Sequence, residues 1–65
     1  MVRTFPSKTA AELFARDNPP RSREGEEVLR TTAEAWGSSW ALRVAIRKTT
    51  PAGVLPVVRY YHEEN

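Results

Sequence analysis

The sequence predicts an α+β fold, in which two helices pack on a small antiparallel sheet built on a C-terminal β-hairpin. Apolar residues recur at helical spacing in two segments of the N-terminal half, 7–17 and 23–36. Large apolar residues alternate with Ala and Arg over 40–48, as in a half-buried strand. A segment rich in Val and Tyr, 54–62, follows after a turn. With 65 residues, we expect a single small domain spanning 1–65.

The first helix is expected over 7–17. Ser7 is a suitable N-cap, and Leu13 and Phe14 anchor the apolar face. The sequence Asn-Pro-Pro at 18–20 ends the helix, because a residue before proline leaves the helical region and proline lacks a backbone donor. A helix this short is not stable alone, so it must pack on the sheet.

The second segment, 23–36, is predicted to be the main helix, with Ser22 as its cap. Its apolar positions form one stripe: Val28, Leu29, Thr32, Ala33 and Trp36. Glutamates gather near its start, where the helix dipole favours negative charge. Gly37 then supplies the left-handed position at which many helices end. The expected core unites this stripe with the inner sheet residues Leu42, Val44, Ile46 and Val58.

The turn between the two C-terminal strands is predicted from Pro51 and Gly53. Proline suits the first central position of a type I turn, and glycine suits a following left-handed position. This three-residue loop gives a register in which paired residue numbers sum to 104, so that Ile46 faces Val58. Pro56 places the last strand at a sheet edge. A short third strand over 2–5 is also considered, because two strands alone are rarely stable.

In that register one sheet face points outward and combines basic, aromatic and aliphatic side chains. Its candidate partner-binding residues are Arg43, Arg47, Arg59, Tyr61, Leu55 and Val57. Arg and Tyr are enriched in protein interfaces, and the same pair can bind phosphate and stack on bases. Three interpretations stay open: a solvated face, a protein interface and a nucleic-acid interface.

Catalytic chemistry is not predicted. The chain has no Cys, so it has no disulfide, and His62 is its single His, too few for a structural zinc site. Nothing nearby activates Ser38 or Ser39 as a nucleophile. We therefore expect a non-enzymatic protein without cofactor or metal. Trp36 and Trp40 could form a ligand shelf, but a place in the core is favoured.

Localisation is predicted to be cytoplasmic, since no apolar run resembles a signal peptide or a membrane span and Cys is absent. The order of two helices and a hairpin is similar to that of small winged-helix DNA-binding domains of the excisionase sort. However, residues 24–36 of the would-be recognition helix carry four Glu and one Arg, the wrong sign for phosphate.

The preferred function is therefore a small binding or regulatory module that engages a protein partner. Its size and lack of a family signature would suit a phage or mobile-element accessory protein that modulates a host machine. The alternative is nucleic-acid binding through the basic outer face of the hairpin. A homodimer is a further prediction, because the domain is small and the last strand leaves an edge exposed.

Overall fold

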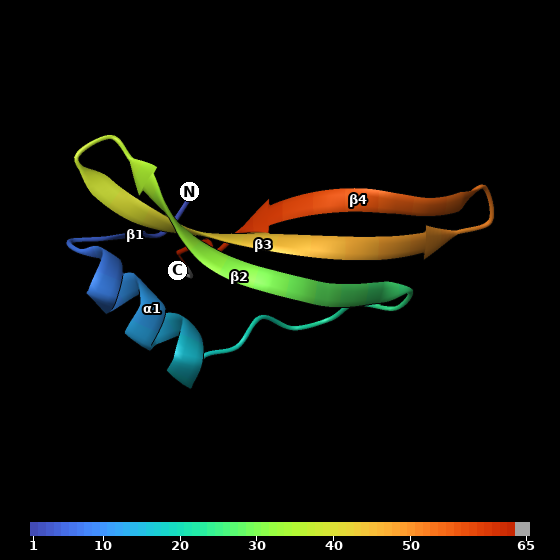
Figure 1. Ribbon diagram of the computed structural model, residues 1–65, viewed down its shortest axis with the longest axis horizontal. Helices are drawn as coiled ribbons and strands as arrows, with labels where there is room; N and C mark the ends of the chain where they lie inside the picture. The colour runs from blue at the N-terminus through green and yellow to red at the C-terminus, as the bar shows by residue number, and fades with distance from the viewer. Residues whose placement is uncertain (64–65) are drawn as a thin grey trace.

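The computed structural model describes residues 1–63, which form one helix and four strands (Figure 1). In chain order the elements are β1 (Thr4–Phe5), α1 (Lys8–Asp17), β2 (Glu26–Trp36), β3 (Ser39–Thr50) and β4 (Gly53–Tyr60). The predicted fold class, two helices on a small sheet, is wrong. The described chain is a four-stranded antiparallel sheet with a single helix.

The longest strand, β3, lies at the centre of the sheet. On one side it pairs with β2 over nearly its whole length. On the other side it pairs first with β1 and then with β4, so these two strands lie end to end. The chain ends meet at this junction, where the Arg3 amide donates to the Tyr61 carbonyl at 2.8 Å and Val2 bridges His62. The third strand considered from the sequence therefore exists.

The first helix agrees with the prediction. The Ser7 side chain accepts a hydrogen bond from the Ala10 amide at 3.1 Å, as an N-cap does. At the other end, the Asn18 amide donates to the Phe14 carbonyl at 2.8 Å, immediately before the two prolines. The helix packs Ala11 against Leu42 of β3, which makes the centre of the core.

The helix covers only part of one sheet face. Ten helical residues span about 15 Å, whereas the molecule is 40 Å long. The connecting segment 18–25 continues beneath the same face towards the start of β2 (Figure 1). We call this side the covered face; β3 contributes Trp40, Leu42, Val44 and Ile46 to it. The opposite side, on which no described helix lies, is the open face.

The second predicted helix is instead the strand β2. Ten of its residues pair with β3, from Glu26 opposite Lys48 to Trp36 opposite Ser39. A β-bulge between Val28 and Arg30 inserts Leu29 as an extra residue. As a result Val28 and Thr31, which both lie on the covered face, are three positions apart. The predicted stripe is therefore divided, with Val28 and Ala33 on the covered face and Thr32 and Trp36 on the open face.

Gly37 turns a hairpin and does not cap a helix. Trp36 pairs with Ser39, so the loop between β2 and β3 has two residues, Gly37 and Ser38. Gly37 has a φ of 63°, and Ser38 has a negative φ. A positive φ at the first loop residue alone is the pattern of a type II′ turn, one of the two favoured hairpin turns.

The hairpin between β3 and β4 exists, but its predicted register is wrong by one residue. Thr50 pairs with Gly53, which leaves a two-residue loop, and paired numbers sum to 103. The Thr50 hydroxyl closes this tighter loop by accepting from the Ala52 amide and donating to the Gly53 carbonyl. The positive φ expected at Gly53 is confirmed, at 129°. A one-residue shift moves every side chain of β4 to the opposite face.

These corrections change the core. Leu42, Val44 and Ile46 are buried, as predicted. Leu29, Trp36 and Val58, which were expected in the core, are 55%, 40% and 45% exposed. Pro56 lies on an edge strand, as predicted, because β4 pairs along its length with β3 alone among the described strands. Within residues 1–63, no helix has the length and apolarity that crossing a membrane requires.

Two leucine substitutions separate this fold from the two-helix alternative. Leu42→Ala should destabilise the protein by about 2–5 kcal/mol, because the side chain is 1% exposed and its loss leaves a cavity. Leu29→Ala should cost about 0.5 kcal/mol, the usual range for a surface position. Urea denaturation followed by tryptophan fluorescence measures both. Equal losses of unfolding free energy in the two variants would contradict the assignment of Leu29 to the bulge.

Candidate functional site

The structure divides the predicted partner-binding residues between the two faces of the sheet. Arg43 and Arg47 of β3 point to the open face, as predicted. Arg59 pairs with Val44 and Val57 pairs with Ile46, so both lie on the covered face, and alternation places Leu55 and Tyr61 there as well. The six residues therefore do not form one surface. Whether any of them binds a partner stays a prediction.

The open face carries an aromatic pair in place of the predicted cluster. The rings of Trp36 on β2 and Tyr60 on β4 lie 5.1 Å apart, although β3 runs between these strands. The Tyr60 hydroxyl donates to the Glu34 carboxylate at 2.6 Å. That hydrogen bond holds the proton on the phenol, raising the pKa of Tyr60 above its ordinary value, with burial adding to the effect.

The aromatic pair depends on a small residue in the central strand. Tyr60 lies opposite Arg43 and reaches Glu34, which lies opposite Ala41, so its ring crosses β3 at Ala41. Ala41 is fully buried although it faces the open side. Larger side chains at this position would hold Trp36 and Tyr60 apart.

Apolar and basic residues surround the aromatic pair on the open face. Val58 and Val54 of β4 are 45% and 59% exposed. Arg47 is paired with Glu27, but both side chains are more than half exposed, so this ion pair adds little to stability. Within residues 1–63, Arg30 and Arg43 make no salt bridge. The open face thus combines exposed apolar area with two arginines that form no salt bridge with a described residue.

The covered face holds a different arrangement, centred on Glu26. Its side chain is only 2% exposed and binds the Arg59 guanidinium through both carboxylate oxygens. One of these oxygens also accepts from the Arg23 amide at 3.2 Å. These contacts link the start of β2, the connecting segment and β4 across the central strand. The hydrogen bond from Arg59 is the main cause that lowers the pKa of Glu26 below its ordinary value.

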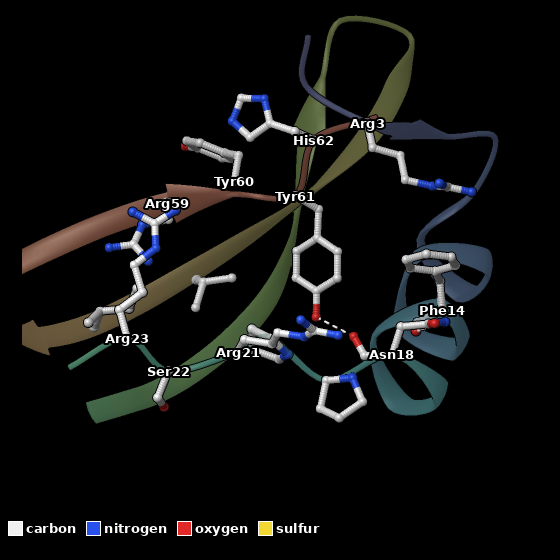
Figure 2. Close-up of a pocket in the computed structure, with 14 residues that line it drawn as sticks. Arg3, Phe14, Asn18, Arg21, Ser22, Arg23, Arg59, Tyr60, Tyr61 and His62 are labelled. Atoms are coloured by element: carbon white, nitrogen blue, oxygen red, sulfur yellow. Dashed lines mark hydrogen bonds between the residues drawn. The ribbon is translucent and has the colours of Figure 1, made fainter. Parts of the chain in front are cut away.

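A groove of about 1010 Å³ lies between the connecting segment and the end of β4. Val44 and Ile46 form its apolar floor, and it is open to solvent. Figure 2 shows Tyr61 reaching from β4 to Asn18, where its hydroxyl donates to the carbonyl at 2.7 Å. Its ring also meets Phe14 edge-on, with 6.0 Å between centroids. We call this hollow the basic groove, for the residues that line it: Arg3, Arg21, Arg23, Arg59 and His62.

The charge of the basic groove is largely uncompensated. No Asp or Glu side chain is among the residues that line it. The guanidinium group of Arg59 is bound to Glu26, whereas Arg3 lies over the Phe14 ring at 4.3 Å, a cation–π contact. Neither Arg21 nor Arg23 forms a salt bridge with any described residue.

Residues that could hold a metal do not gather in the described part of the chain. No three His, Cys, Asp or Glu side chains of residues 1–63 come together as metal ligands would. His62 lies at the rim of the basic groove (Figure 2). Comparison of the chain with protein-family models, with curated proteins and with solved structures finds no match.

Sequence reasoning missed Trp36 and Tyr60 as surface residues, although a signal for them was present. Gly37-Ser38, directly after Trp36, is the dipeptide of a two-residue hairpin loop. That loop makes 31–36 a strand in which Thr32, Glu34 and Trp36 share one face. No comparable sequence pattern predicts where Arg21 and Arg23 lie, because they belong to the irregular connecting segment 18–25, which has no repeating pattern of residues.

The Glu26–Arg59 ion pair predicts how stability depends on pH. Because the folded pKa of Glu26 is lowered, the pair stabilises the protein fully above about pH 4.5 and loses this effect as pH falls through the folded pKa. Glu26→Gln should lower the melting temperature at pH 7 and give a smaller further decrease between pH 5 and 3 than the parent shows. Thermal melts by circular dichroism test this, with Glu12→Gln on α1 as the control. Parallel pH profiles for parent and Glu26→Gln would contradict the assigned role.

Proposed function

We propose that this protein is a non-enzymatic binding module that engages a protein partner through its open face. The observation that supports this is the Trp36–Tyr60 pair, in which Trp36 is 40% exposed and Tyr60 partly exposed, on a sheet face that no described helix covers. Trp, Tyr and Arg are the residues that most often dominate the binding energy of protein interfaces. On this face they stand together with the exposed Val58.

The structure of the open face also indicates the chemistry of the partner. It carries the exposed apolar side chains Trp36 and Val58, and its Arg30 and Arg43 make no salt bridge with a described residue. A complementary partner would place an apolar patch against Trp36 and Val58 and carboxylates around it. The aromatic pair is already ordered by the hydrogen bond between Tyr60 and Glu34. Binding therefore immobilises few additional side chains, which favours affinity.

The alternative, nucleic-acid binding through the outer face of the hairpin, has less support. It relied on Arg59 and Tyr61 beside Arg43 and Arg47, but the first two lie on the covered face. Two carboxylates, Glu27 and Glu34, accompany the arginines that remain on the open face. Their negative charge disfavours a phosphate backbone at this surface.

A second copy of the chain is the competing occupant of the open face. Glu27 and Glu34 of one copy could meet the arginines of another, so the face is partly complementary to itself. Sedimentation velocity at high micromolar concentration distinguishes this arrangement from binding to a different protein. A dimer that Trp36→Ala converts to a monomer would assign the face to self-association and contradict the proposed function.

The proposed interface predicts unequal effects of substitutions on partner affinity. Trp36→Ala should weaken binding about 30-fold or more, because a central anchor contributes about 2 kcal/mol or more. Arg43→Ala should weaken binding about tenfold. The partner would be captured from the native host with the parent protein, and its affinity for each variant would be measured by calorimetry.

The matched control for Trp36→Ala is Leu13→Ala, since Leu13 is a similarly exposed apolar residue, 46% exposed, on α1. Its affinity for the partner should equal that of the parent. A captured protein that binds all variants equally would place the interface elsewhere, and the open-face proposal would be wrong.

A further inference from the structure

We propose that the basic groove on the covered face is a second binding site, which takes the phosphates of a nucleotide chain, that is, of single-stranded nucleic acid. This site is independent of the open face, and the residues that carry it are different. Arg3, Arg21 and Arg23 supply the cationic groups, and Tyr61 supplies an aromatic wall. The proposal moves the nucleic-acid hypothesis from the hairpin surface to a hollow that the sequence did not reveal.

The first argument is the unbalanced charge of the groove. Four arginines line it, no Asp or Glu side chain is among the described residues of its lining, and the Glu26 carboxylate beside it is bound through both oxygens to Arg59. Like charges gathered around one hollow repel one another unless an anion joins them. The groove therefore concentrates positive potential at one place on a chain whose formal net charge is only +2.

The second argument concerns the type of cation. All the strongly basic side chains that line the groove are arginines, with no lysine among them. The planar guanidinium fork matches two oxygens of a phosphate at once and is less strongly hydrated than an ammonium group. In Figure 2, Arg21 lies beside the Tyr61 hydroxyl, while Arg23 and Arg59 lie together on the other side of the hollow. Successive phosphates of one chain could therefore meet guanidinium groups on both sides.

The third argument distinguishes a nucleotide chain from an acidic peptide. The ring of Tyr61 is partly exposed, and it is fixed at both ends by β4 and by its hydrogen bond to Asn18. A fixed, partly exposed aromatic ring is a surface on which a base can stack. The volume of about 1010 Å³ reaches the upper limit for sites of compact small ligands, and the hollow is open to solvent. Both properties suit several units of a chain.

The test measures fluorescence anisotropy of labelled 15-nucleotide dT and rU strands, titrated with the full protein at low and moderate salt. Arg21→Ala/Arg23→Ala changes two exposed residues of the connecting segment. Its matched control, Lys8→Ala/Arg16→Ala, removes the same charge from α1, away from the groove. The groove variant should bind at least about tenfold more weakly, and its salt slope should fall by roughly 1.4, or 0.7 for each lost phosphate contact. The control should stay within about twofold of the parent.

Ser22→Glu is a second variant, which adds a negative charge to the groove and leaves every arginine in place. Ser22 is exposed and lines the groove between the two arginines, so a carboxylate there should repel phosphate without disturbing the core. We expect a loss comparable to that of the double alanine variant. Circular dichroism confirms that each variant is folded. Trp36→Ala should bind the strands as the parent does, which separates the failure of this proposal from failure of the open-face proposal.

Competition experiments with ATP and poly-glutamate identify the class of anion that the groove binds. Weak competition by ATP beside tight binding of the strands supports a nucleotide chain, whereas ATP that competes as well as the strands would assign the groove to free nucleotides. Poly-glutamate that competes as well as the strands would overturn the proposal. Equal losses in the groove variant and in the α1 control would also overturn it, because binding would then reflect only net charge.

Discussion

The pairing of β3 on both of its sides is the constraint on which the other elements depend. One strand of 12 residues holds β2 along one edge and β1 and β4 along the other. Its alternation places Leu42, Val44 and Ile46 beneath the helix and the connecting segment. Arg43, Ala45 and Arg47 consequently point to the side that no described helix covers. The covered face and the open face therefore follow from this one strand.

Alternation within β3 was readable from the sequence because every second residue from Trp40 to Ile46 is apolar. The short helix was readable too, since Ser7 and the two prolines mark its limits. The register of β4 could not be predicted, because Pro51 and Gly53 suit both a two-residue and a three-residue loop. The observed loop is the shorter one, and the Thr50 hydroxyl makes two hydrogen bonds within it. One residue of difference then moved Arg59 and Tyr61 from one predicted site to the opposite face.

The error at β2 has a different cause, since the local preferences of this segment conflict. Glu, Leu, Arg and Ala favour a helix, whereas Val28, Thr31 and Thr32 favour a strand. The bulge at Leu29 also shifts the alternation of side chains by one residue, so the segment lacks the simple period of two that marks a strand. Pairing with β3 decides in favour of the strand, because the edge of β3 offers hydrogen bonds along the segment. The open face could not be predicted while this segment was assigned to a helix.

Successive residues at the end of β4 and directly after it alternate between the two faces of the sheet. By register, Val58 and Tyr60 lie on the open face, while Arg59 and Tyr61 lie on the covered face and line the basic groove. The open face has carboxylates among its arginines, whereas the described lining of the groove has none, so the two surfaces favour ligands of different charge. Because the sheet separates them, a protein on one side would leave the groove accessible. The Glu26–Arg59 ion pair bears on both surfaces, because it fixes β4 and the connecting segment relative to each other.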